Sequence, residues 1–293
     1  MSQTSFTSKQ LRFTLILNPA NANSVFPGTN SNTLVLANLR AIANIQTVPG
    51  IPTRTSVKLF GMKKQDMFAL SVIFFNGTQN LKYNQLIIEQ NSGSGWTQIF
   101  NGMITDAQPR FRGMPNVFFD IQAIVGYNHQ IAPVPPISFK GTVPVDTIVK
   151  QLAGTMGFAY VNDGVTANLT NFYGPGTSMD QLNRVCQMSR TQYVIAGDTL
   201  GIYPIGKSRP SVPLLQLSPQ SGLEGYPELE KFGIVITSLF NPAMVAGGQI
   251  QVVGSDIPNA NGTWAPFVVD HALESNNPGG RWHSVAQCIP VPQ

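Results

Sequence analysis

Apolar and polar residues alternate along several short stretches in the first 132 residues of the chain. From Leu11 to Leu17 every second residue is apolar, and most of the residues between them are polar. A period of two is typical of a β-strand with one buried face. Further strands are indicated at residues 41–45, 57–59, 86–88, 96–104 and 117–125. The pattern predicts a β-rich region over residues 1–132, with a hairpin at the Asn91–Gly95 turn and a short helix within residues 62–71.

The periodicity becomes helical after the proline cluster at residues 133–136. Between residues 145 and 156, apolar side chains recur three or four positions apart, which is the spacing of an amphipathic helix. Gly157 follows directly, and glycine is a typical helix stop. This segment predicts the first helix of a small α/β region that extends over residues 133–210.

A second helix is predicted to begin at Ser178. Its hydroxyl group and the amide of Gln181 have the spacing of a capping box, in which each side chain satisfies a backbone N–H group at the helix start. Apolar runs on both sides of residues 197–198 indicate a hairpin that completes the α/β region.

Strands return over residues 211–293. β-Branched and aromatic residues, which are enriched in strands, are found at 234–236, 249–253 and 267–269. The order of strand, turn, tryptophan and strand around Trp96 is repeated around Trp264. The two segments are either copies of one structural module or two unrelated hairpins that each contain a tryptophan, and the sequence leaves both readings open.

The composition is unusual because charged residues are scarce. Only 11% of the 293 residues are charged, whereas about a quarter is usual, and the chain contains 23 Asn and 21 Gln. Amides lose less free energy than charges when they are buried, and interface cores are depleted in charge. The composition therefore favours a subunit that is buried in an assembly, over the alternative of a β-protein that merely has few charges.

The net charge of +4 is spread thinly. Basic residues cluster only at Lys63-Lys64 and at Arg110 with Arg112, which are interpreted as solvated loop positions. A nucleic-acid-binding protein would show a continuous basic stripe. The pattern therefore disfavours a dedicated nucleic-acid binder.

Several features predict a protein that is made and kept inside a cell until it is released. No stretch reaches the roughly 18 apolar residues that a membrane span needs, so no membrane anchor is expected. The polar N-terminus does not resemble a signal peptide. Cys186 and Cys288 are too few for a disulfide framework and are expected to be free thiols.

Residues 201–208 match the phosphate-binding P-loop pattern letter for letter. The pattern needs a helix after the loop, and here Pro204, Pro210 and Pro213 disfavour one. The segment is therefore interpreted as a strand that runs into a linker. This interpretation argues against a nucleotide-dependent enzyme.

His271 and His283 are interpreted as structural histidines, because no third ligand with suitable spacing accompanies them. The HExxH, GxSxG and CxxC patterns are absent. The sequence therefore predicts no enzyme and no catalytic, cofactor or metal site.

Short sequence words recur in a characteristic order over most of the chain. They are Val57–Met62, Tyr83-Asn84, Phe100–Ile104 with Asp106-Ala107, Leu152–Gly157, Gly225–Pro227, Gly233-Ile234, Leu239–Pro242, Gly262–Trp264 and Pro278–Trp282. Each word alone is weak, but their order resembles the baseplate hub proteins of contractile-tailed bacteriophages.

This resemblance implies an α+β, predominantly β fold. Two barrel-like antiparallel β domains, at residues 1–132 and 211–293, would flank the small α/β domain at residues 133–210. It also implies a structural homotrimer, in which six similar β modules surround a channel and adapt a sixfold tail tube to a threefold central spike. The implied location is the tail baseplate of a virion that is assembled in the host cytoplasm.

The implied partners are the tail tube or a tube-initiator protein, the central spike, other baseplate proteins and the tape-measure protein, with DNA passing only transiently through the channel. Phe240, Asn241 and Pro242 are the predicted partner interface at a module edge; the alternative is a turn inside one domain. A rival function is a carbohydrate-binding or receptor-binding tail component, in which Trp96, Trp264 and Trp282 would stack on sugars. A hub with attached wall-degrading activity lacks a segment for the additional domain.

Overall fold

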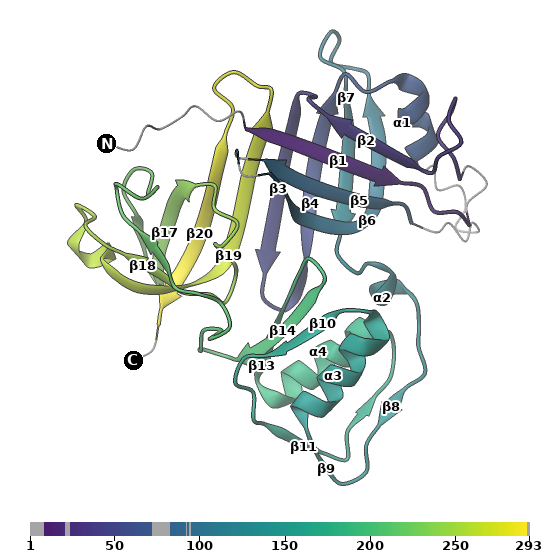
Figure 1. Ribbon diagram of the computed structural model, residues 1–293. Helices are drawn as coiled ribbons and strands as arrows, with labels where there is room; N and C mark the ends of the chain where they lie inside the picture. Colours follow the sequence, from purple (N-terminus) through teal and green to yellow (C-terminus); the bar gives the residue numbers. More distant parts are fainter. Residues whose placement is uncertain (1–8, 21–23, 72–82, 92, 94, 292–293) are drawn as a thin grey trace. The chain divides into compact units, whose positions relative to one another are not determined.

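The computed structural model describes residues 9–20, 24–71, 83–91, 93 and 95–291, and in these residues the protein is predominantly β with few helices (Figure 1). The strands are β1 (Gln10–Ile16), β2 (Thr33–Ala37), β3 (Ala41–Val48), β4 (Ile51–Phe60), β5 (Gln85–Asn91), β6 (Trp96–Arg110), β7 (Phe118–Ile124), β8 (Ile137–Ser138), β9 (Thr142–Pro144), β10 (Ala159–Asn162), β11 (Asn168–Thr170), β12 (Tyr173–Gly174), β13 (Thr191–Ala196), β14 (Thr199–Pro204), β15 (Leu215–Leu217), β16 (Glu228–Glu230), β17 (Gly233–Leu239), β18 (Ile250–Val252), β19 (Gly262–Ser275) and β20 (Trp282–Pro290). The helices are α1 (Lys64–Leu70), α2 (Asn128–Ile131), α3 (Val145–Met156), α4 (Ser178–Ser189) and the 3-10 helix η1 (Pro258–Ala260).

Thirteen strands form one large sheet in the order β16-β17-β20-β19-β3-β4-β7-β6-β5-β1-β2, with β18 paired to β19 and β15 paired to β18. Among the described strands, β16 and β2 are the two ends of this path, and no pairing joins them. The predicted antiparallel β architecture is confirmed at this coarse level, but neither of the two barrels is observed as a closed ring. The alternation of side chains shows which face of a strand is buried, but not which strand it pairs with.

The chain divides into two compact units. One unit contains Met1–Ile45, Arg54–Val125 and Ala272–Trp282, and the other contains Gln46–Thr53, Gly126–His271 and His283–Gln293. The division into three domains at residues 1–132, 133–210 and 211–293 stays a prediction.

In the first unit, the strands predicted from alternation are confirmed. β1 buries every second residue, and its Leu11, Phe13 and Leu15 are at most 1% exposed. β5 and β6 form the predicted antiparallel hairpin, although Ser92 and Ser94 of its turn lie outside the described residues. The predicted short helix is α1.

In the second unit, α3 and α4 lie against the three-stranded sheet β10-β14-β13 (Figure 1). α3 spans the predicted residues, and Gly157 ends it in the left-handed conformation, with φ of 76°. β13 and β14 form the predicted hairpin around residues 197–198. The predicted α/β character of this region is therefore confirmed.

The capping box of α4 was predicted one residue too late. The N-cap is Thr177, whose Oγ1 accepts a hydrogen bond from the Asp180 backbone N–H at 3.1 Å, while the Asp180 carboxylate accepts one from the Thr177 backbone N–H at 3.0 Å. Ser178 is instead buried, at 1% exposure. An Asp three residues after Thr177 completes the box as well as a Glu or Gln would, so a pattern that requires Glu or Gln selects the wrong residue.

β13 and β14 also contribute to a hydrophobic core that they share with β15, β17, β18, β19 and β20. Its buried side chains are Val194, Tyr203, Leu217, Leu223, Ile234, Ile236, Met244, Ala246, Ile250, Val252, Ala260, Val269, Ala286 and Cys288. Cys288 and Cys186 are both free and buried, as expected. In the described part of the chain, the longest helices have 12 residues, and none has the length and apolar character of a bilayer span.

Candidate functional site

The predicted interface residues form a fixed turn after β17. Asn241 Oδ1 accepts a hydrogen bond from the Ala243 backbone N–H at 2.9 Å, and the Asn241 carbonyl accepts one from the Met244 N–H at 3.0 Å. Phe240 and Asn241 are half-buried, and Pro242 is exposed. The structure therefore brings the three residues together as one turn, with only Pro242 fully open to solvent.

His271 contacts this turn through the ring of Phe240 and through Ser284. Its ring packs edge-on against Phe240, with centroids 5.1 Å apart, and its Nδ1 lies 2.8 Å from Ser284 Oγ. Ser284 Oγ also accepts a hydrogen bond from the Asn241 N–H at 3.1 Å. Burial lowers the pKa of His271 to about 4, so the ring is neutral at pH 7 and its Nδ1 shares a hydrogen bond with the Ser284 hydroxyl. His271 thus makes structural contacts with the turn.

His283 has a separate role. Its Nδ1 pairs with the carboxylate of Glu224, which belongs to the segment before β16. In the described residues, no group of three or more His, Cys, Asp or Glu side chains is placed to hold a metal ion. The two histidines therefore serve two different structural contacts.

A buried ion pair joins the residue that follows β10 to the segment after β14. Arg209 Nε donates to Asp163 Oδ2 at 2.8 Å, and the Ser211 backbone N–H donates to Asp163 Oδ1 at 3.0 Å. The side chains are 10% and 1% exposed, respectively. Burial alone would raise the pKa of Asp163, but the hydrogen bonds from Ser211 and Arg209 outweigh it and lower the pKa. The carboxylate is therefore ionised, and both of its oxygens accept hydrogen bonds within the protein.

Arg209 also accounts for the glycine that begins the P-loop-like sequence at residues 201–208. Gly201 lies inside β14, and a side chain there would overlap the Arg209 guanidinium. Residues 205–208 form a turn and loop with no helix after them. Gly201 therefore makes room for an arginine, and the predicted strand-to-linker reading is confirmed.

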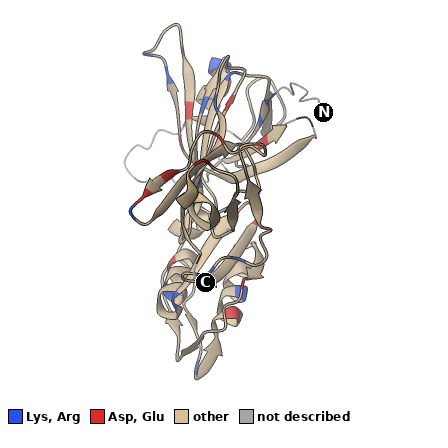
Figure 2. Ribbon diagram, turned by 90° about the vertical axis from the view of Figure 1, so that its left-hand side faces the viewer, with Lys and Arg blue, Asp and Glu red and all other residues tan. Residues whose placement is uncertain are grey.

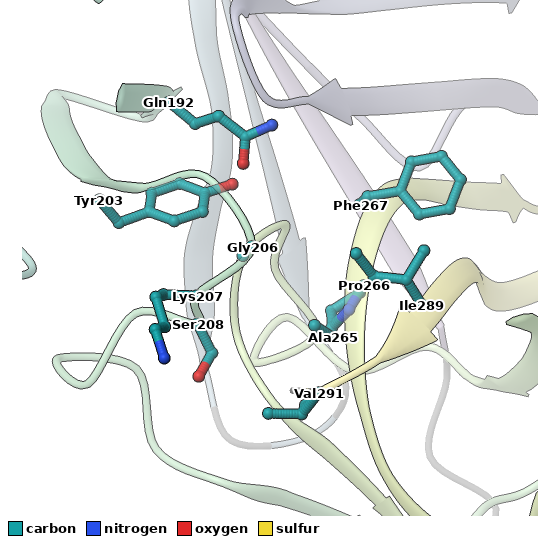
Figure 3. Close-up of a pocket in the computed structure, with 11 residues that line it drawn as sticks. Gln192, Tyr203, Gly206, Lys207, Ser208, Ala265, Pro266, Phe267, Ile289 and Val291 are labelled. Carbon is teal, nitrogen blue, oxygen red and sulfur yellow. The ribbon is translucent and has the colours of Figure 1, made fainter. Parts of the chain in front are cut away.

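The loop borders a small cavity. Figure 3 shows Gly206, Lys207 and Ser208 at one wall and Ala265, Pro266 and Phe267 of β19 at the other. The volume accessible to water in the cavity is about 30 Å³, which is room for only a few water molecules. It is too small for a nucleotide.

The three tryptophans have structural contacts. Arg12 lies over the ring of Trp96 at 4.4 Å from its centroid, and Trp264 Nε1 donates to the Ala260 carbonyl at 2.8 Å. Trp282 is 4% exposed. Stacking on sugars would require open ring faces, and the covered face of Trp96 and the burial of Trp282 disfavour it at these two rings.

Charged residues are sparse along the whole ribbon (Figure 2). The fold nevertheless brings the two basic clusters of the first unit to one surface, because Lys64 of α1 lies over the ring of Phe111, which stands between Arg110 and Arg112. Sequence reasoning treated the clusters as separate loop positions, and nothing in their spacing indicated that they meet. It also left unremarked the exposed β16–β17 hairpin of the second unit.

The sequence matches a family model. The model described as Baseplate hub gp41 aligns with residues 64–279. No curated protein sequence gives a significant match to the chain.

Solved structures resemble the fold at low sequence identity. A tail protein from Neisseria meningitidis has a TM-score of 0.62 at 10% identity, and the match covers 96% of each chain. A 43 kDa tail protein of prophage MuSo2 from Shewanella oneidensis has a TM-score of 0.59 at 8% identity, with 97% of this chain and 99% of that one covered.

A third structure comes from Escherichia coli and is described as a type VI secretion component similar to the T4 bacteriophage tail proteins gp27 and gp5. It has a TM-score of 0.57 at 10% identity, with 91% of this chain and 76% of that one covered. At these identities the likeness establishes a shared fold.

Proposed function

Because the chain belongs to the Baseplate hub gp41 family, whose members are structural phage tail proteins, we propose that it forms a homotrimeric ring between a sixfold tail tube and a threefold central spike. The observation that carries the proposal is the family match over residues 64–279. The fold supports it, because two tail proteins, one of them from a prophage, share this fold over nearly their whole lengths.

In this proposal, each subunit presents two equivalent β modules, one from residues 1–132 and one from residues 211–293, with the α/β region of residues 133–210 between them. Support comes from two antiparallel strand pairs, β5–β6 and β18–β19, in which a tryptophan lies near the start of the second strand. Three subunits would then offer six similar modules, which is how a threefold ring can match a sixfold tube.

The role is mechanical. The ring leaves a channel for DNA and the tape-measure protein, works in the baseplate of the virion, and contacts the tube or its initiator, the spike and other baseplate proteins. The scarcity of charge supports burial among such partners. The turn at Phe240, Asn241 and Pro242 is a proposed contact, with the exposed Pro242 facing the partner.

The mass of the purified chain in solution tests the ring. Native mass spectrometry or light scattering should give three times the chain mass, either for the chain alone or after addition of its spike protein. A chain that stays monomeric beside both the tube and the spike proteins would exclude the ring.

A further inference from the structure

Two exposed patches of this chain are complementary in charge and both contain large apolar side chains. From them we infer the contact that closes the proposed ring: the acidic β16–β17 hairpin of one copy packs on a basic patch around α1 of a second copy. The inference rests on the proposed trimer and specifies which surfaces meet in it. A ring needs two different patches on each subunit, and this pair supplies them.

The acidic hairpin is the patch formed by Tyr226, Glu228, Leu229, Glu230, Lys231 and Phe232. Its two glutamates outnumber its one lysine, and Lys231 Nζ lies 5.2 Å from the centroid of the Phe232 ring. Its three apolar side chains are 66%, 55% and 77% exposed in the order Tyr226, Leu229, Phe232. β16 is the end strand of its sheet, so one edge of its backbone is open to a partner. Neither Glu228 nor Glu230 has an ion-pair partner among the described residues.

This concentration of exposed groups is notable in a chain with so few charges. The other glutamates of the described chain, Glu89, Glu224 and Glu274, each pair with a basic side chain. The hairpin therefore combines the two glutamates that lack such a pair with the most exposed phenylalanine of the described residues.

The basic patch is formed by Lys63, Lys64, Phe68, Phe111 and Arg112, with the exposed Met114 beside it. The rings of Phe68 and Phe111 are 6.3 Å apart, and Lys64 Nζ lies 5.9 Å from the centroid of Phe111. Phe68 is 58% exposed and Met114 is 78% exposed. Lys64 thus lies at an apolar centre, with Lys63 next to it in sequence and Arg112 next to Phe111.

The two patches are complementary in charge, and both carry exposed apolar side chains. The hairpin offers two carboxylates and one lysine beside Leu229 and Phe232, a net negative charge. The basic patch offers Lys64 over Phe111, with Lys63 and Arg112 adjacent in sequence, a net positive charge. Large apolar and aromatic groups supply most of the binding energy of an interface, while opposite charges at its rim fix the register and reject like-charged partners. A second copy of this chain is therefore the occupant that satisfies both patches at once.

A charge-swap experiment tests the pairing. The variants Glu228→Lys/Glu230→Lys and Lys63→Glu/Lys64→Glu should each weaken the association of the trimer at least about tenfold, because each places like charges against each other. A three-membered ring assembled from a mixture of the two double variants would still contain at least one contact between like charges. All four changes are therefore combined in one chain, which should return to the wild-type mass. Asp256→Lys and Lys150→Glu, at exposed positions outside the patches, are the matched controls and should leave the mass unchanged.

A cross-linking experiment identifies the geometry. Leu229→Cys protein is mixed with tagged Phe68→Cys protein, so a disulfide between the two residues can form only between chains. The native Cys186 and Cys288 are buried and need not be removed. Met188→Cys, exposed on α4, replaces Phe68→Cys in the control and should give no cross-link.

The outcomes separate the contact from the ring. If the wild-type chain is a trimer and both charge-reversal variants keep the trimer mass, the patch pairing is wrong while the proposed ring stands. The same holds if the variant that carries all four changes stays dissociated. In that case the glutamates serve only to keep the edge strand from aggregating. A wild-type chain that remains monomeric beside its tube and spike proteins overturns both.

Discussion

The Arg209–Asp163 pair and the β16–β17 hairpin show two opposite uses of charge in one sparsely charged chain. Arg209 and Asp163 are buried, and the two carboxylate oxygens of Asp163 accept hydrogen bonds from Arg209 and Ser211. Glu228 and Glu230 are exposed and have no ion-pair partner among the described residues. The buried charges stabilise the fold, whereas the exposed charges of the hairpin are available to a partner. Mutation of the first should lower the free energy of unfolding, and mutation of the second should change association.

The largest effect is expected from breaking the buried pair. Arg209→Ala would leave the Asp163 carboxylate buried without its cation and should lower the free energy of unfolding by about 3–5 kcal/mol. Urea denaturation measures this. Arg281→Ala is the control: its side chain is 57% exposed, so loss of its pair with Glu274 should cost about 1 kcal/mol or less. Equal losses in the two variants would contradict the distinction between the pairs.

The two histidines extend the comparison to pH. His271 has its pKa lowered to about 4 by burial, whereas an unfolded histidine titrates near about 6.5. Between these values the unfolded state binds a proton that the folded state does not. Stability from this residue is therefore complete above pH 6.5 and falls by about 3 kcal/mol as the pH drops to 4.

The measurement is the difference between the pH profiles of wild type and His271→Gln, which cancels the titration of the carboxylates common to both. The variant should be less stable at pH 7, because it loses the contact with Ser284, but its stability should decline less between pH 6.5 and 4. His283→Gln, at a half-buried position, keeps His271 and should retain the steeper decline. Parallel profiles for wild type and His271→Gln would show that the buried ring does not titrate as described.

A smaller effect distinguishes the P-loop lookalike from a true P-loop. Gly201→Ala should lower the free energy of unfolding by about 1–3 kcal/mol, since the methyl group would displace Arg209. Lys207→Ala, at an exposed position, should change it by no more than about 0.5 kcal/mol. Thermal unfolding of the two variants gives the comparison. A larger loss for the lysine than for the glycine would reverse the assignment of roles.

The smallest effect on folding is expected in the hairpin. Phe232→Ser removes a side chain that is 77% exposed, so the free energy of unfolding measured at a concentration where the chain is monomeric should change by about 0.5 kcal/mol or less. Sedimentation at higher concentration should show weaker association for the same variant. A large loss of monomer stability would mean that Phe232 packs within its own chain.

Local structure was predictable where one rule decided it. Alternation located β1, helical spacing and a stop glycine located α3, and the hairpin of β13 and β14 followed from its turn. The start of α4 at Ser178 was predicted correctly, but its N-cap was missed by one residue, because Thr177 and Ser178 can both cap a helix.

Long-range pairing was not predictable from these rules. The sheet order places β19 next to β3, more than two hundred residues away in sequence, and no local pattern encodes that choice. The same limit hid the buried pair, since Arg209 and Asp163 are 46 residues apart. It also hid the basic patch, whose members come from α1 and from the loop after β6. The turn at residues 240–242 was found from its own sequence, but its support by His271 and Ser284 was not.

The division of the chain into two units has a consequence for durability. The backbone passes from one unit to the other five times, at residues 45/46, 53/54, 125/126, 271/272 and 282/283. A protease that cuts any one of these crossings leaves the other four intact, so a single nick cannot release either half. Neither half can be produced as one uninterrupted fragment, and a particle that must survive outside a cell gains redundancy from such interleaving.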